Sequence, residues 1–590
     1  MRSASLTSMK LSDQILSRRT VEAMIADGKS IIIYENRVLR VDSWLPKHPG
    51  GEKVVFHMVG RDATDEINAY HCEETKAQVR KYQIGRVLGP WVNFVPPIQG
   101  GKFRSIGTET PVDDEAISVG SYSSSLASSE ASIASSSDEE AAGFTTSAEQ
   151  AKMATARRIA APCNEYNAAK MTATKKTKKP LEKVVVAPQR RELPEAAELL
   201  AEYEQKAYEM DVARYPTVDH ETQAYITQKY RELEARLQEG GYFQCTYWGY
   251  GRECVRYFLF GLLAYMFLRI KWYCTSAFFL GVLWHQLTFT VHDSAHYAIT
   301  HNFLIDNLIG GFIADYVGGL SVGWWKRNHN VHHVVTNDPI HDPDIQHLPF
   351  FAVSTKLFGN VFSTYYERVL QYDAFAHMLI PIQNYMYYPI LCFGRFNLYR
   401  LSWEYLIRGL GPRHGKAAWF RYYEILGMIV FWYWFGYKLV YQTLPSNRVR
   451  FVYIMISHIV TMPLHVQITL SHFAMSTADL GAGESFAQKM LRTTMDVDCP
   501  TWLDFFHGGL QFQAVHHLFP RLPRHNLRDA QAHVIEFCKE VDVQYCIYGF
   551  VDGNKEVISR LADIGKQASI MADCSSHIAQ EVAVSGRVEM

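Results

Sequence analysis

The chain has 590 residues, too many for one ordinary domain, so several parts are expected. Its 59 Lys and Arg balance 60 Asp and Glu, and the net charge of -1 gives no reason to expect a nucleic acid as partner. Hydrophobic residues make up 48% although the mean hydropathy is only -0.12, which indicates membrane spans diluted by soluble segments. The ten cysteines are scattered without a Cys-x-x-Cys pair, which favours a reducing, cytosol-facing compartment.

Residues 11–88 predict a small soluble α+β domain. Short β-rich runs at 30–34 and 38–41 flank a hairpin-like turn, and helical patches with turn glycines follow over 52–82. The string His48-Pro49-Gly50-Gly51 comes soon after Trp44, and His71 lies 23 residues beyond His48. This pattern resembles the cytochrome b5 haem domain, in which histidines at these two positions are the axial ligands. The resemblance implies that His48 and His71 bind a haem b.

The resemblance also implies a role for this haem. Two axial imidazoles leave no open position for oxygen, so the haem would pass electrons and not oxidise a substrate itself. His57 lies between the two expected ligands on an apolar helix, and we expect it to be structural.

Residues 103–190 predict a disordered linker, because a stretch rich in Ser, Ala, Glu and Asp cannot bury enough apolar area to offset its ordering entropy. Its basic run at 175–179 is a solvated linker or, as an alternative, a segment attracted to anionic headgroups. Residues 192–250 have helical periodicity without a membrane-length apolar run, so they predict cytosolic helices.

Residues 251–550 predict an all-α integral membrane domain with about four transmembrane helices and a cytosolic cap. The four apolar segments near the ~20 residues that a bilayer requires are about 254–271, 273–291, 423–443 and 451–471. The apolar stretch 303–323 is expected to be re-entrant or interfacial, since a fifth span would separate the histidine clusters described next. Basic residues in the 292–416 connection favour the cytosol for that side. Residues 555–590 are expected to form a flexible tail.

Three histidine clusters surround these spans. The first is His292 and His296, the second is His329, His332 and His333, and the third is Gln513, His516 and His517. Their spacings of three and four residues put each set on one helix face. Imidazoles concentrated in this way are typical ligands of iron, copper or zinc.

Other residues extend the predicted site. His472 ends the last span as His292 ends the second, and we expect it to be an eighth histidine ligand. Asp338, Asp342 and Asp344 follow the second cluster; they are expected either to orient ligand imidazoles or to cap turns at Pro339 and Pro343. His285, His458 and His465 lie in the spans at heptad spacing from the clusters. They line a substrate channel or form helix–helix hydrogen bonds.

The boxes HxxxH, HxxHH and QxxHH resemble those of membrane fatty-acyl desaturases, which use a histidine-ligated di-iron centre. The fused haem domain and Gln513 in the third box resemble the front-end desaturases. Four further strings are most similar to fungal sphingolipid delta-8 desaturases: Val59–Ile67, Pro96–Gly101, His341–Phe350 and Gln511–Pro520. The resemblance covers the front domain and about 240–550.

The resemblance implies an oxidoreductase of the endoplasmic reticulum membrane, with its haem domain and histidine boxes facing the cytosol. Its substrate would be the long-chain base of ceramide and its co-substrate O2, and NADH-derived electrons would arrive through cytochrome b5 reductase. Gln513 would hydrogen-bond at the metal site or coordinate weakly. The alternatives are a delta-6 or delta-5 fatty-acyl desaturase, a haem-fused lipid hydroxylase and, in a different class, a non-catalytic haem-binding membrane adaptor.

Overall fold

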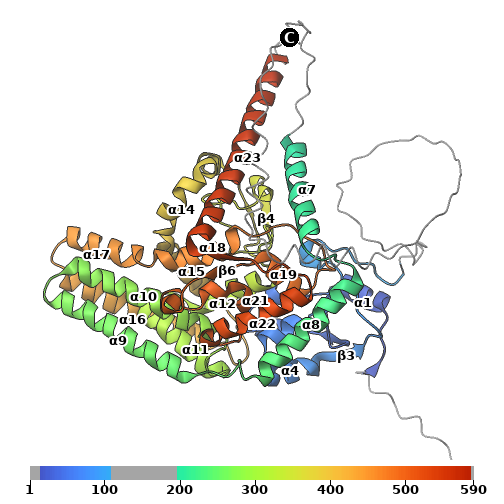
Figure 1. Cartoon of the computed structure of the whole chain (residues 1–590), viewed down its shortest axis with the longest axis horizontal. Helices are drawn as coiled ribbons and strands as arrows, with labels where there is room; N and C mark the ends of the chain where they lie inside the picture. The colour runs from blue at the N-terminus through green and yellow to red at the C-terminus, as the bar shows by residue number, and fades with distance from the viewer. Residues whose placement is uncertain (1–12, 108–195, 586–590) are drawn as a thin grey trace, which may run out of the picture. The chain divides into compact units, whose positions relative to one another are not determined.

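The computed structural model describes residues 13–107 and 196–585 (Figure 1). The chain divides into two units, one formed by residues 1–103 with 184–590 and the other by residues 104–183. Nearly all of the second unit lies outside the described residues, and so does nearly all of the predicted 103–190 linker with its basic run. All of the predicted site residues belong to the first unit.

A three-stranded antiparallel sheet organises the N-terminal domain. Strands β1 (Ile31–Tyr34) and β2 (Arg37–Arg40) form a hairpin, and β3 (Gln83–Arg86) pairs with the other edge of β2. Glu35 and Asn36 have φ values of 50° and 60°, because a two-residue hairpin turn that matches the strand twist needs left-handed backbone. The helices of this domain are α1 (Arg18–Ala26), α2 (Lys53–Phe56), α3 (Thr64–Tyr70) and α4 (Glu73–Val79). The predicted α+β domain is confirmed.

The rest of the described chain is mostly helical, as predicted. Helices α7 (Ala196–Arg214) and α8 (His220–Glu239) come first. The apolar side chains of α8 recur every three or four residues and are fully buried: Ile226, Tyr230, Leu233 and Leu237. They share one core with Val515 and Leu518 of α21 (Gln513–Leu518), the helix that carries the third histidine box.

Long helices then form an antiparallel hairpin, drawn in green in Figure 1. Helix α9 (Tyr247–Arg269) and helix α10 (Tyr273–Ala295) are joined by a tight turn in which Lys271 has a φ of 65°. A second apolar pair follows later in the chain: α16 (Phe420–Phe431) continues as the π-helix η8 (Trp432–Thr443), and α17 (Asn447–Ile459) leads into α18 (Met462–Phe473). Helix α10 packs against both α9 and α17.

Two helices among the described residues are long and apolar enough to cross a membrane. They are α10 and the continuous Asn447–Phe473 segment, and both coincide with predicted spans. A third is reached if Phe303–Gly318 and Val322–Val334 are counted together, although this pair is bent by 117°. The predicted spans at 254–271 and 423–443 fall on α9 and on α16 with η8, which do not meet the combined requirement for length and apolar character, although α9 is as long as α10. The number of four spans therefore stays a prediction.

The bent pair positions the second histidine box. Helix α11 (Phe303–Gly311) and the π-helix η5 (Phe312–Gly318) run into a sharp turn, after which α12 (Val322–Val334) begins. The turn needs glycine, because Gly319 has a φ of 70° and a Cβ there would meet the Phe431 ring at 2.3 Å. This bend brings α12 back toward the end of α10.

The prediction of a flexible tail from residue 555 is wrong for the described residues. The chain forms one helix, α23 (Phe550–Ser585). Its fully buried side chains are Val557, Leu561, Ile564 and Ala568, spaced by three and four residues. Ile564 and Ala568 pack against Ala376 of α13 (Ala374–Leu379) and the adjacent Ile380. The apolar stripe on one face therefore stabilises the helix, because tertiary packing supplies most helical stability.

Short elements complete this half of the chain. The helices are α14 (Gln383–Leu391), α15 (Gly394–Arg408), α19 (Phe486–Thr493), α20 (Asp504–His507) and α22 (Leu527–Glu540). The strands are the antiparallel pair β4 (Val361–Ser363) and β5 (Arg368–Leu370), and the parallel pair β6 (Asp496–Asp498) and β7 (Ile547–Gly549).

Candidate metal centre and haem site

The predicted histidines converge from four helices. His292 and His296 lie at the C-terminal end of α10, the second box lies on α12, His472 ends α18 and the third box lies on α21. In one set the ligand atoms all lie within 4.8 Å of one another, and they belong to His292, His296, His329 and His516. The same holds in a second set for His332, His472 and His517. The three boxes and His472 therefore lie together in the structure, and their role as metal ligands stays a prediction.

His333 lies between the two sets. Its Nε2 is 3.0 Å from Nε2 of His329, which belongs to the first set. Its ring also stacks on the ring of His517 in the second set, with centroids 4.2 Å apart. The eight predicted histidines, His472 among them, therefore form one continuous cluster.

Most of these imidazoles have a buried nitrogen without a hydrogen-bond partner. The unpartnered atoms are Nε2 of His292, His296, His516 and His517, and Nδ1 of His333 and His472. A buried polar atom left unpaired costs about 1–3 kcal/mol, so six in one cluster need a compensating partner. A pair of metal ions would satisfy them, and an all-nitrogen donor set with nearby carboxylates suits iron. The residues present therefore fit the di-iron centre that the resemblance to membrane desaturases implies.

Carboxylates orient part of the cluster. The Nδ1–H of His332 donates to Asp342 Oδ2 over 2.8 Å, which leaves Nε2 of His332 as the free lone pair. The Nδ1 of His329 lies 3.4 Å from Asp344 Oδ2. Asp338 instead accepts from the backbone N–H groups of Ile340 and His341, so it caps a turn. Of the three predicted aspartates, two therefore contact imidazoles and one does not.

Burial keeps the third box in the neutral form that a metal requires. Desolvation and the neighbouring His292 hold the pKa of His516 well below its usual value, and desolvation with His472 does the same for His517. His517 also directs Nδ1 toward Thr336 Oγ1 at 3.4 Å, which leaves its Nε2 free. Gln513 is buried at the first position of the same helix, one turn before both histidines.

The predicted haem ligands face each other in the N-terminal domain. The ring centroids of His48 and His71 are 6.2 Å apart, close to the roughly 6 Å expected when two imidazoles bind one metal ion from opposite sides at about 2 Å each. Each Nδ1–H donates to a backbone carbonyl, that of Gly51 for His48 and that of Ile67 for His71. Both Nε2 atoms are thereby left as lone pairs, as haem iron requires.

Burial favours the neutral form of both haem-ligand imidazoles. Desolvation lowers the pKa of His48 to about 4 and that of His71 to about 3, so both imidazoles are neutral at physiological pH. His57 is fully buried and its Nδ1 pairs with Gln99 Nε2 at 3.0 Å, in agreement with the structural role predicted for it.

The haem domain packs directly on the helix of the second box. Val331, Val334 and Val335, in and just after α12, belong to the same apolar core as Leu45 and Ile67 of the haem domain. Tyr70, the residue before the haem ligand His71, donates its hydroxyl to the carbonyl oxygen of His333 and places its ring 5.8 Å from that imidazole. Arg521, just after the third box, donates to the His71 carbonyl oxygen over 2.9 Å. The two predicted redox sites are thus joined by direct contacts.

Of the heptad-spaced histidines, His458 forms the helix–helix hydrogen bonds that were one of the two predicted roles, and the lining of a substrate channel stays a prediction. His458 hydrogen-bonds Tyr399 through Nε2 at 3.1 Å and the Ile454 carbonyl through Nδ1, so it fastens helices together. His285 stacks on Phe506 and its Nε2 has no partner. Neither residue belongs to the metal-ligand sets described above.

An ion network beside the first box was not anticipated from the sequence. Arg524 is buried and donates to Asp293 Oδ2 over 2.6 Å and to Glu253 Oε2. Asp293 also accepts from the Tyr250 hydroxyl, and its carboxylate lies 3.8 Å from His292 Nδ1. Trp325, also not anticipated, stacks on His329 with ring centroids 4.2 Å apart. The only local signal was the position of Asp293 inside the first box.

Comparison with known proteins agrees with this geometry. A fatty acid desaturase family model matches residues 270–549, and a cytochrome b5-like haem/steroid binding domain model matches residues 17–88. A Delta 8-(E)-sphingolipid desaturase of Emericella nidulans is 52% identical, over 96% of this chain and 98% of its own length. A protein of the same description from Candida albicans is 50% identical, over 96% of this chain and 99% of its own length. An acyl-lipid (9-3)-desaturase of Borago officinalis is 38% identical, over 50% and 64%.

Three observations support the same assignment. They are the apolar helices of spanning length, the histidine cluster and the similarity to desaturases over nearly the full length of the chain. The chain is an integral membrane oxidoreductase that belongs to the fatty acid desaturase family, with a fused cytochrome b5-like domain.

Proposed function

We propose that this protein is a sphingolipid delta-8 desaturase, which uses O2 to introduce a double bond into the long-chain base of ceramide. The observation that carries the chemistry is the cluster of eight histidines with six unpartnered buried nitrogens. The substrate is supported by relatives of that description, which match nearly the whole chain.

The proposed ligands divide as the structure groups them. His292, His296, His329 and His516 would hold one iron, His332, His472 and His517 the other, and His333 lies where it can serve either. When bound, the irons would activate O2, the oxidant that removes hydrogen from an unactivated C–H bond, which side chains alone cannot do. Asp342 holds the His332 ring in the orientation and tautomer that present Nε2 to a metal. Gln513 is proposed to hydrogen-bond at the edge of this site.

The haem domain is proposed to deliver the electrons. A reductase using NADH would reduce the haem held by His48 and His71. From His71 the covalent neighbour Tyr70 reaches His333 of the second box through its ring and hydroxyl. No mobile carrier is needed for this step, because the haem domain already packs on α12.

The proposed location is the endoplasmic reticulum membrane, with the haem domain and the boxes on the cytosolic side. The convergence of all three boxes supports a single side for them. The basic residues of the 292–416 connection favour the cytosol for that side.

A second candidate is a front-end fatty-acyl desaturase. It is favoured by the acyl-lipid desaturase already described and by a Delta(8)-fatty-acid desaturase 2 of Arabidopsis thaliana that is 37% identical over 60% of this chain. These likenesses cover much less of the chain than those to the sphingolipid enzymes. A lipid hydroxylase could use the same cluster, whereas an adaptor without catalysis gives no account of its unpartnered nitrogens.

The experiment compares wild type with His332→Ala, purified from a host that makes no delta-8 unsaturated bases. We expect wild type to contain haem and iron and to form the unsaturated base. The variant should keep haem, lose its non-haem iron and form no product. Unchanged iron content and product in the variant would refute the metal assignment, and changes confined to fatty-acyl chains would refute the substrate.

A further inference from the structure

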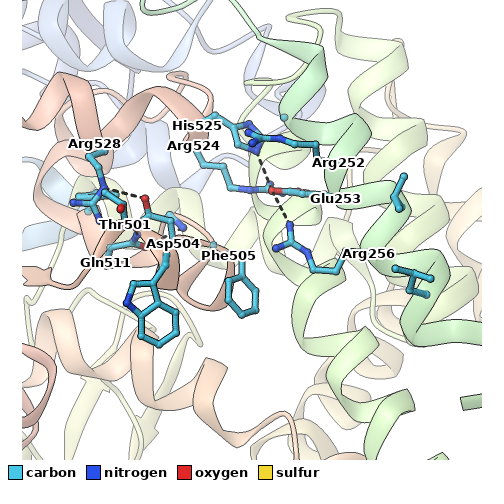
Figure 2. A pocket seen from close by; sticks show the side chains of 17 residues that line it. Arg252, Glu253, Arg256, Thr501, Asp504, Phe505, Gln511, Arg524, His525 and Arg528 are labelled. Atoms are coloured by element: carbon cyan, nitrogen blue, oxygen red, sulfur yellow. Dashed lines mark hydrogen bonds and ion pairs between the residues drawn. The ribbon is translucent and has the colours of Figure 1, made fainter. Parts of the chain in front are cut away.

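A pocket of about 580 Å³ lies beside the first histidine box and is not used by the proposed chemistry. One wall is the first half of α9, and the other is the chain before and after the third box (Figure 2). Glu253 pairs with Arg524 on one side of the pocket, and Arg528 pairs with Asp504 on the other, as Figure 2 shows. Ion pairs therefore border the pocket on both sides.

The lining of the pocket carries more positively charged than negatively charged side chains. The lining holds Arg252, Arg256, Arg524 and Arg528 against Glu253 and Asp504. The last two arginines are paired, Arg524 with Glu253 and Asp293 and Arg528 with Asp504. Arg252 is exposed and forms no ion pair among the described residues. Among the described residues Arg256 has one ion pair, with the already shared Glu253 at 3.8 Å; its guanidinium also lies 5.2 Å from the centroid of the Phe505 ring, and its Nε is buried without a hydrogen-bond partner.

These two arginines can act on one ligand. They are four residues apart on α9, so their side chains lie on the same helix face. Guanidinium groups present forked N–H donors that match phosphate oxygens. A ligand phosphate in the pocket would give Arg252 a counter-ion and would give the Arg256 guanidinium, whose side chain is 25% exposed, a second anionic partner.

The apolar part of the lining indicates that the phosphate belongs to a lipid. Val255 and Leu259 line the same pocket and are 61% and 49% exposed. Phe258 and Leu262 of the same helix are also exposed. Trp502 is 70% exposed at the pocket and Trp248 is 73% exposed in the first turn of α9. Exposed tryptophans are enriched at headgroup level, where arginines attract anionic lipids.

We propose that this pocket binds an anionic phospholipid, with its phosphate on Arg252 and Arg256 and an acyl chain along Val255 and Leu259. Ceramide is a poor occupant, because it has no charge and would leave both guanidinium groups without a counter-ion. The pocket is therefore proposed to hold a lipid other than the substrate, and its test does not depend on desaturase activity.

The test measures binding of short-chain phosphatidic acid to the full-length, haem-loaded protein in neutral detergent by native mass spectrometry. We expect Arg252→Gln/Arg256→Gln to bind it about tenfold more weakly or worse, the loss of at least one charge-assisted hydrogen bond. Arg269→Gln is the matched control, since Arg269 is exposed at the opposite end of the same helix. It should bind as wild type does.

Competitors identify the ligand class. Inorganic phosphate and short-chain ceramide should not displace phosphatidic acid, and phosphatidylcholine should displace it only weakly. Equal binding by wild type and both variants would overturn the proposal, as would displacement by an equal concentration of phosphate or of ceramide. Haem absorbance reports folding of the variants. If the double variant fails to fold, Arg252→Gln alone must weaken binding, because that exposed side chain makes no ion pair that folding would lose.

Discussion

Replacing Asp342 by asparagine should release iron while leaving the haem in place. The Asp342 side chain is fully buried and accepts three hydrogen bonds. Oδ2 accepts from His332 Nδ1 at 2.8 Å and from the Asn337 backbone N–H at 2.7 Å, and Oδ1 accepts from the Asp344 backbone N–H at 2.8 Å. An asparagine of the same shape offers one acceptor oxygen and one NH2 group, so it cannot accept all three.

The magnitude follows from this mismatch. In one orientation the asparagine oxygen accepts the hydrogen bonds from His332 and Asn337, and its NH2 group faces the backbone N–H of Asp344, so that bond is lost. In the opposite orientation the oxygen accepts from Asp344, and the hydrogen bonds from His332 and Asn337 are lost. In either case His332 also loses the negative charge that supports it as a ligand. Hydrogen bonds to charged groups contribute about 1.5–3 kcal/mol, which corresponds to roughly 10–100-fold in affinity. Iron affinity should fall by about that factor.

The assay titrates the purified protein with an iron chelator and measures retained iron by mass spectrometry, with haem absorbance recorded in parallel. Asp338→Asn is the matched control, because it makes the same charge change in the same loop. Asp338 only caps a turn, and an asparagine can form the same cap. We expect the control to retain iron as wild type does. Iron retained equally by all three proteins, or lost equally by both variants, would refute the proposed role of Asp342.

Three further predictions test the haem site, the contact between the redox sites and a buried carboxyl. His71→Ala should abolish the haem absorbance while the non-haem iron is retained, and loss of both would contradict separate sites. Tyr70→Leu should slow reoxidation of the reduced haem in stopped-flow measurements with O2 and substrate more than Tyr70→Phe, which keeps the ring against His333; equal rates in all three proteins would exclude this route. Burial raises the pKa of Asp496 from 3.8 to about 6, so the native state binds a proton that the unfolded chain releases in this interval. The thermal stability of wild type relative to Asp496→Asn should therefore fall as pH rises from 3.8 to about 6, and a pH-independent difference would contradict it.

Much of the metal site follows from helix periodicity. Histidines spaced by three and four residues must share a helix face, so each box could be predicted as a unit. The position of His472 at the end of an apolar span suggested that it meets the boxes, and the structure places it beside His332 and His517. How the histidines divide into two sets could not be predicted, because that depends on how four helices cross.

Contacts between distant segments left no local signal. Arg524 pairs with Asp293 across 231 residues and with Glu253 across 271, and no spacing rule connects them. The haem domain could be predicted from His48 and His71, but its packing against Val331 of α12 depends on complementary surfaces. The tail was mispredicted for a related reason. Its apolar stripe is modest, and Leu561 and Ile564 become informative only beside the segment around Ile380 that buries them.

The most direct test of the central claim is the position of the new double bond. The wild-type chain and its His332→Ala variant would be expressed in a host without delta-8 unsaturated bases, and released sphingoid bases analysed by ozone-induced fragmentation in a mass spectrometer. The account predicts a double bond at the eighth carbon of the long-chain base with wild type and none with the variant. New double bonds found only in fatty-acyl chains, or an unsaturated base formed equally by the variant, would contradict it.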